Sequence, residues 1–104
     1  MNEANIDIKH VVTSTEAIVV LGETVHIHMT DDLRVDDQYC EGVFYLSRRA
    51  IYLENRLCNQ PDRLERVRAH EIMHAYLGIS GLAEMLDPKM EEAICVLTES
   101  MNIH

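Results

Sequence analysis

The segment "RVRAHEIMHAYLG", residues 66–78, contains two histidines four positions apart, with a glutamate directly after the first. On an α-helix, residues i and i+4 lie one above the other on the same face. Asn59 is a suitable N-cap, Pro61 suits the first turn, and Gly78 is a typical C-terminal stop. The segment therefore predicts a helix over residues 60–77 that carries His70 and His74 on one face.

Two imidazoles in this arrangement can bind one tetrahedral metal ion, and Zn²⁺ accepts histidine nitrogens at about 2.0–2.1 Å. Glu71 is rotated about 100° from His70 around the helix, so it flanks the ion and does not bind it. There it can take a proton from a zinc-bound water, which is the division of labour in HExxH hydrolysis. The alternative reading is two surface histidines beside a glutamate that forms a salt bridge.

A catalytic zinc needs a third protein ligand and one open position. The best source is the last predicted helix, which begins at Asp87-Pro88 and carries Glu91 and Glu92 near its start. We expect its apolar stripe to pack inward, and this stripe comprises Met90, Ala93, Ile94, Leu97 and Met101. Glu91 lies at the edge of that stripe and Glu92 points towards solvent, which favours Glu91 as the ligand. Glu92 stays open, because acids in a first turn also stabilise a helix through its dipole. His10, His26, His28, His104, the cysteines and the other acids stay open as donors too.

The first half of the chain alternates in hydrophobicity and predicts strands. Candidate strands lie within residues 6–12, 17–21 and 24–30, with a turn at 22–23, a polar loop over 30–42 and a strand–turn–strand unit over 43–54. Strands followed by two helices indicate an α+β domain. We expect a small antiparallel or mixed sheet, then the HExxH helix, then a C-terminal ligand-bearing helix, in one domain over residues 1–104.

Composition restricts the partners. The formal net charge of −9 disfavours nucleic acid, because an acidic surface repels phosphate. The three cysteines, Cys40, Cys58 and Cys95, have no CxxC spacing, nothing near Met1 resembles a secretory leader, and no apolar run approaches membrane length. We expect a cytoplasmic protein with reduced thiols, a protein or peptide substrate and no membrane partner. The sequence does not set the oligomeric state.

Other residues could contribute to a site. His26 and His28 alternate onto one strand face and could form a second metal pair, although exposed strand histidines are the more common case. Tyr39, Tyr45 and Tyr52 could stabilise an oxyanion, and the sequence selects none of them.

The stretches "EGVFYLSRRAIYLENRL", "RVRAHEIMHAYLGISGL" and "KMEEAICVLTES" together resemble the very short zincin-type metallopeptidases of phages and prophages, which are related to ImmA/IrrE-like and minigluzincin proteins. The resemblance implies a minimal zincin of the gluzincin type. In it His70 and His74 are zinc ligands, Glu71 is the general base and the third ligand fits Glu91 better than Glu92. It also implies that "AIYLE" or "VFYL" is an edge strand that holds the substrate extended.

The resulting hypothesis is a zinc metallopeptidase, an endopeptidase rather than an exopeptidase, acting in the host cytoplasm if it is phage-encoded. A second hypothesis is a weak or inactive protein of the same fold, a phage accessory or anti-defence protein that binds a host protein. A third is a structural metal with the function elsewhere.

Overall fold

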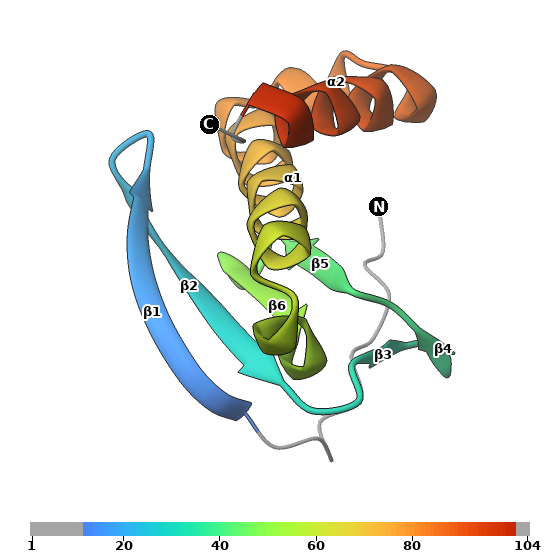
Figure 1. Ribbon diagram of the computed structural model, residues 1–104. Helices are drawn as coiled ribbons and strands as arrows, with labels where there is room; N and C mark the ends of the chain where they lie inside the picture. The colour runs from blue at the N-terminus through green and yellow to red at the C-terminus, as the bar shows by residue number, and fades with distance from the viewer. Residues whose placement is uncertain (1–11, 102–104) are drawn as a thin grey trace.

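Residues 12–101 are described by a computed structural model, and they form an α+β domain in which one helix covers a sheet and the second helix packs against the first (Figure 1). This confirms the predicted fold class. The elements are β1 (Val12–Val20), β2 (Glu23–Thr30), β3 (Arg34–Val35), β4 (Gln38–Tyr39), β5 (Gly42–Tyr45), β6 (Ala50–Glu54), η1 (Asn55–Asn59), α1 (Pro61–Ser80), η2 (Leu82–Glu84) and α2 (Pro88–Met101).

The main sheet has four strands in the order β1-β2-β6-β5. β2 and β6 are parallel, whereas β1 pairs with β2 and β5 with β6 in antiparallel fashion, so the sheet is mixed. β5 is therefore an edge strand in the described part of the chain, and β6 is internal. Of the two segments expected to provide an edge, "VFYL" does so and "AIYLE" does not.

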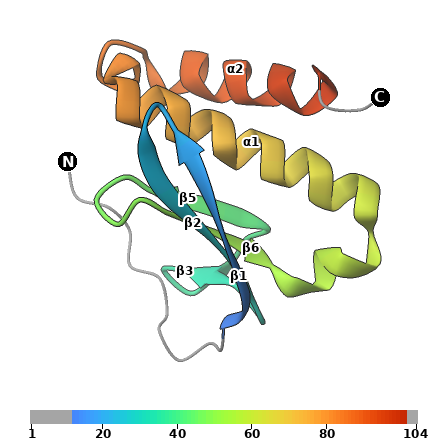
Figure 2. The same ribbon diagram turned by 90° about the vertical axis from the view of Figure 1, so that its left-hand side faces the viewer.

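The hydrophobic core lies between this sheet and α1. Val25 and Ile27 of β2 and Ile51 and Leu53 of β6 face Ala75 of α1, and all five are buried. The alternation expected for β2 is therefore confirmed. The small β3–β4 hairpin lies on the side of the sheet away from the helices (Figure 2).

A buried carboxylate fixes the hairpin to the sheet. Glu54, at the end of β6, is 1% exposed and accepts hydrogen bonds from the backbone N–H groups of Leu33 and Arg56 at 2.8 and 2.9 Å. Satisfying the carboxylate with two donors compensates the cost of burying it.

Several local predictions differ from the structure. Gln60, and not Asn59, is the N-cap of α1, and part of the expected loop over residues 30–42 forms β3 and β4. The β1–β2 turn is Leu21-Gly22, one residue earlier than expected, and both residues have positive φ, 51° and 81°, as a type I′ hairpin turn requires. α1 continues past Gly78 to Ser80 and ends at Gly81, which has a φ of 86°. Gly81 adopts the left-handed conformation that the C-terminal cap requires. Gly78 instead lets the helix approach Phe44 of β5, because a Cβ there would lie 3.2 Å from Cε2 of that ring.

The inward stripe expected for α2 is wrong. Met90, Leu97 and Met101 are 56%, 65% and 69% exposed, whereas Cys95 is fully buried. The helix turns its acidic side towards the histidines of α1, because the imidazole nitrogens offer partners that the methionines cannot use. α2 runs back alongside α1 (Figure 2), as the short connection predicts.

The predicted strand at 6–12 lies outside the described residues except for Val12, as do His10 and His104. In the described range, no helix has the length and apolar character needed to span a membrane.

Candidate metal centre and cleft

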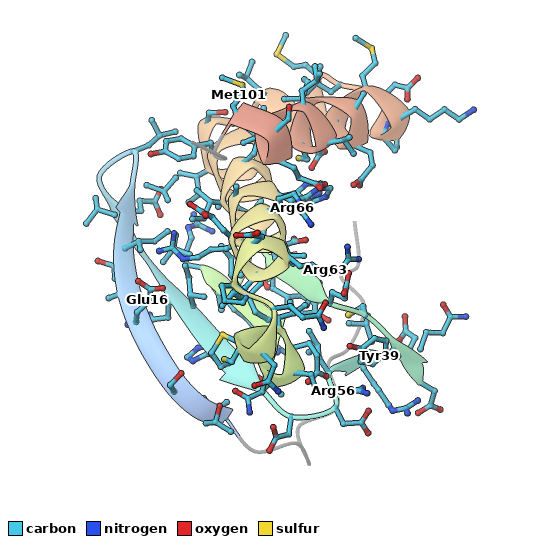
Figure 3. The ribbon with its side chains drawn as sticks, viewed as in Figure 1. Glu16, Tyr39, Arg56, Arg63, Arg66 and Met101 are labelled. Carbon is cyan, nitrogen blue, oxygen red and sulfur yellow. The ribbon has the colours of Figure 1, made fainter. Side chains whose placement is uncertain are left out.

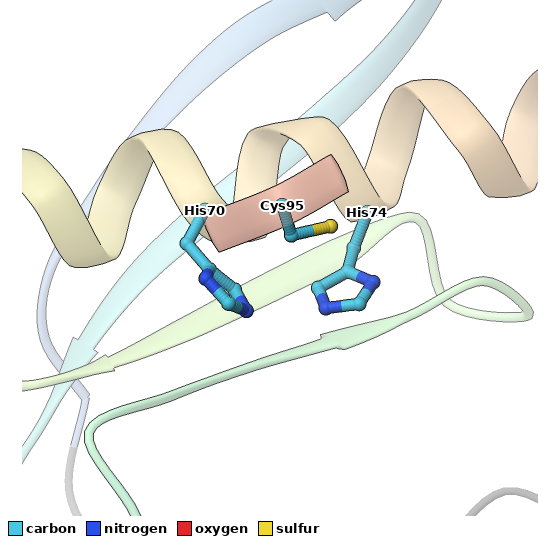
Figure 4. Close-up of side chains that lie close together, drawn as sticks. All are labelled: His70, His74 and Cys95. Atoms are coloured by element: carbon cyan, nitrogen blue, oxygen red, sulfur yellow. The ribbon is translucent and has the colours of Figure 1, made fainter. Parts of the chain in front are cut away.

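His70 and His74 project from the same side of α1, as their spacing predicts (Figure 4). Their ring centroids are 5.0 Å apart, and their side chains are 14% and 19% exposed. The two rings are therefore close enough to share one ion and are still reachable from solvent.

Each ring is oriented by a carboxylate of α2. Nδ1 of His70 lies 2.6 Å from Oε2 of Glu99, and Nδ1 of His74 lies 2.6 Å from Oε2 of Glu91. Metal-binding histidines commonly donate their second ring N–H to a carboxylate, which fixes the tautomer and strengthens the ligand. The structure thus places Glu91, the predicted third ligand, behind His74.

Glu92 lies in front of both rings. Its Oε1 is 2.6 Å from Nε2 of His70, and its Oε2 is 3.6 Å from Nε2 of His74. Two ligand atoms of a tetrahedral zinc site are roughly 3.3 Å apart, given bonds of about 2.0–2.1 Å. The spacing between Glu92 and His74 is near that value, whereas the shorter spacing to His70 is a direct hydrogen-bond distance, so the Glu92 carboxylate lies within reach of an ion shared by both rings.

Cys95 forms a second possible donor to the same pair. Its Sγ and one nitrogen from each of His70 and His74 all lie within 4.8 Å of one another (Figure 4). These three residues could hold a metal ion. Cys95 is fully buried, and burial, with nearby Glu92 and Glu91 adding to the effect, raises the pKa of its thiol to about 12. An ion bound through Cys95 would lie inside the helix interface.

Glu71 lies against the inner side of the sheet and is 7% exposed. Burial raises the pKa of its carboxyl, an effect that His74 and His70 oppose and Glu92 and Glu99 reinforce. A raised pKa brings a carboxylate closer to the range in which a general base works near neutral pH.

Gly42 of β5 makes room for Glu71. A Cβ at this position would lie 3.0 Å from Cγ of Glu71, 3.0 Å from Cγ1 of Val67 and 3.1 Å from Cδ2 of Leu53. The absence of a side chain at Gly42 therefore allows the carboxylate-bearing helix to approach the edge strand.

An open cleft runs along β5 on both sides of Glu71. One half has a volume of about 360 Å³ and is lined by Gly42, Val43, Phe44, His70, Glu71, His74, Glu91 and Glu92. The other half has a volume of about 230 Å³ and is lined by Glu41, Gly42, Arg63, Arg66, Val67, His70, Glu71 and Glu99. Gly42, His70 and Glu71 belong to both halves, whereas His74 and Glu92 line only the larger one, so the candidate metal centre extends from the junction into the larger half.

The backbone of β5 presents hydrogen-bonding groups to this cleft. The N–H of Glu54 donates to the carbonyl of Glu41, and bonding residues alternate along an antiparallel pair. The outward-facing backbone groups of β5 are therefore those of Gly42 and Phe44. They could accept an extended peptide as an added strand.

The remaining candidates lie elsewhere. Tyr45 and Tyr52 pack with Leu33, and Arg56 stacks over Tyr39 on the β3–β4 hairpin. None of the three tyrosines lines the cleft, so none of them is placed to stabilise an oxyanion there.

His26 and His28 stack with ring centroids 6.1 Å apart on the other face of the sheet. Within residues 12–101, no third metal-binding side chain joins this pair.

The sequence did not single out Glu99, Cys95 or Gly42, although the cysteines and the other acids stayed open as metal donors. A signal for Glu99 was present, because residues 92 and 99 are seven apart and so lie on one side of a helix. Cys95 follows Glu91 by one helical turn, but the apolar stripe centred on Met90 predicted that a different face of the helix is buried. The contact at Gly42 depends on how α1 sits on the sheet, which no local pattern reveals.

Residues 63–103 match a family model described as DA1-like, Protein DA1. The match includes α1 from Arg63 and all of α2, and it covers fewer than half of the 104 residues. Comparison with curated proteins and comparison with solved structures gave no match.

The match overturns the resemblance to the short phage zincin-type, ImmA/IrrE-like and minigluzincin proteins, since the motif-bearing segment fits a different family. Two histidines one turn apart on a helix, followed by a helix that carries acids, is an arrangement that many metal sites use. Such chemistry recurs on unrelated chains and does not identify a family.

Proposed function

We propose that the protein is a zinc-dependent metallopeptidase whose centre is built from α1 and α2. The observation that carries this proposal is the arrangement of the two histidines between three carboxylates. Both Nε2 atoms face Glu92, and both Nδ1 atoms contact a further acid, Glu99 or Glu91. Two oriented imidazoles and one carboxylate form a donor set that suits Zn²⁺ and leaves a position open.

We assign the third ligand to Glu92 in place of Glu91, which the sequence favoured. Glu91 contacts the ring nitrogen of His74 that points away from the shared centre, whereas Glu92 contacts the nitrogens that face it. Glu91 and Glu99 then act as positioning residues. Glu92→Gln should weaken zinc binding by more than about 100-fold, beyond the 10- to 100-fold typical of an outer carboxylate.

In the reaction, the cleft binds an extended peptide against the backbone of Gly42 and Phe44. His70, His74 and Glu92 would hold a zinc ion, which would supply a Lewis acid for activating water and polarising the peptide carbonyl. Glu71 accepts the proton of the attacking water at its carboxylate and passes it to the nitrogen of the leaving amine. Gly42 allows Glu71 to reach the bound peptide at the middle of the cleft.

The test compares zinc-loaded wild-type protein with Glu71→Gln. We expect the wild type to hydrolyse peptides from a random library and Glu71→Gln to lose about 100-fold or more of the rate while still binding zinc. Glu65→Gln is the matched control, because Glu65 is an exposed glutamate on the same helix outside the cleft. Equal rates for wild type and Glu71→Gln would refute the role of Glu71.

A structural metal site is the second candidate, and the position of Cys95 favours it. A metal held by His70, His74 and Cys95 would crosslink α1 to α2 inside their interface. Chelation would then unfold the protein and Cys95→Ser would abolish binding. In the peptidase, chelation removes activity and leaves the fold intact, because the core between sheet and α1 does not involve the ion.

A further inference from the structure

We infer that Arg66 is a specificity residue that binds a carboxylate of the substrate. This rests on the proposed peptidase function and assigns it a substrate class: peptides with an acidic group one or two residues from the bond that is cut.

Arg66 differs from the other arginines in its partners. Arg34, Arg49, Arg56, Arg63 and Arg68 each form an ion pair with a glutamate or aspartate, and Arg48 lies over the ring of Tyr45. Across residues 12–101, Arg66 has no ion pair, hydrogen bond or ring contact. It is nevertheless half-buried and lines the cleft. A partly buried arginine whose guanidinium donors have no partner among the described residues is suited to bind a carboxylate in bidentate fashion.

Three acids line the same half of the cleft: two of them are engaged by other side chains, and the third is the buried Glu71. Glu41 binds Arg63 through two hydrogen bonds, and Glu99 contacts Nδ1 of His70. Arg63 and Arg66 both project from α1 near β5 (Figure 3). Because the charge of Arg63 is balanced by Glu41, Arg66 supplies the uncommitted positive charge at this end of the cleft. The other half contains only acidic and apolar or metal-site side chains.

The position of Arg66 sets the distance from the reacting bond. It precedes His70 by one helical turn on the same face, which is about 6 Å along the axis. A peptide extended along β5 advances about 3.3 Å per residue, so 6 Å corresponds to roughly two residues. The flexible arginine side chain covers the first or second residue from the bond on the Arg63 side of the cleft.

The carboxylate could come from an aspartate or glutamate within a peptide or from a free C-terminus. The test digests two random peptide libraries with zinc-loaded protein and maps the cut sites by mass spectrometry. One library is N-acetylated and C-amidated, and the other has a free C-terminus. Internal acids act in both libraries, whereas a terminal carboxylate acts only in the second.

We expect wild type to favour an acid, or a free terminus, at one position by about 10- to 100-fold, the range for a hydrogen-bonded ionic contact. Arg66→Gln should lose this preference and Arg66→Lys should retain part of it. Arg68→Gln is the matched control, because Arg68 is two residues away and pairs with Glu16 on β1, outside the cleft. Identical profiles for wild type and Arg66→Gln would overturn the inference.

A binding arm separates this inference from the proposed function. Fluorescein-labelled libraries rich in aspartate, and the same libraries with asparagine in its place, are titrated with zinc-loaded Glu71→Gln protein. Tighter binding of the aspartate library by Glu71→Gln, and loss of this preference in the double variant Glu71→Gln/Arg66→Gln, supports the inference. If wild type shows no cleavage in that case, only the proposed peptidase function fails. Cleavage without acid preference, or no difference between the two libraries, refutes the role of Arg66.

Discussion

Replacing Gly42 with alanine tests whether the approach of α1 to β5 positions the catalytic carboxylate. The added Cβ would lie 3.0 Å from both Glu71 Cγ and Val67 Cγ1, where ordinary contacts begin near 3.4 Å. Glu71 must therefore move by at least a few tenths of an ångström. A 1 Å misplacement can cost about 100-fold in rate, so we expect a shift of a few tenths of an ångström to lower kcat/KM by about 4- to 10-fold. Overpacking should also cost about 1–3 kcal/mol of stability.

The assay measures peptide hydrolysis, zinc affinity and thermal unfolding of the same preparations. Gly42→Ala should bind zinc like wild type, because the methyl group contacts neither histidine, and its Tm should fall by roughly 4–8 °C per kcal/mol. The control is Gly78→Ala, whose Cβ would meet the movable side-chain ends of Phe44 and Leu46 at 3.2 and 3.3 Å. It should retain activity. Full activity in Gly42→Ala would refute the claim that this glycine sets the position of Glu71.

Three further predictions concern the acids and thiols. Glu91→Gln and Glu99→Gln should each weaken zinc binding about 10- to 100-fold, measured by competition with a chelating dye, and unchanged affinity would show that neither orients a ligand. In the metal-free protein, burial raises the pKa of Glu71. Its contribution to stability is present at low pH and is lost as the pH rises through that raised pKa. The free energy of unfolding of Glu71→Gln, measured by urea denaturation, should therefore rise relative to that of wild type as the pH rises. A difference between the two proteins that does not change with pH would contradict this. Alkylation of the native protein should modify exposed Cys58 first, while Cys95 reacts only on unfolding, because it is buried and its pKa is raised to about 12. Rapid modification of Cys95, read by peptide mass mapping, would show that the α1–α2 interface opens.

The sequence predicted the features that follow from the periodicity of a strand or a helix alone. The alternation of Val25 and Ile27 with His26 and His28 predicted the inner and outer faces of β2, and Pro61 marked the start of α1. The i, i+4 spacing of His70 and His74 predicted that the rings share a face. These features depend only on backbone periodicity.

The packing of α2 could not be predicted in the same way. Its methionine stripe has the spacing of a core-facing surface, yet Met90 and Met101 are exposed and Cys95 is buried. The orientation of α2 depends on the contacts of its three acids with two imidazoles of α1. The hydrophobicity pattern of α2 alone contains no information on these contacts. The choice between Glu91 and Glu92 therefore depended on tertiary structure.

The most direct test of the central claim is zinc K-edge X-ray absorption on the zinc-loaded protein, with Cys95→Ser measured alongside. We predict one zinc per chain with two imidazoles and light oxygen ligands, a spectrum that is unchanged in Cys95→Ser and loses an oxygen ligand in Glu92→Ala. A zinc–sulfur shell near about 2.3 Å that vanishes in Cys95→Ser would contradict the account, because the metal would then lie in the helix interface and not in the cleft.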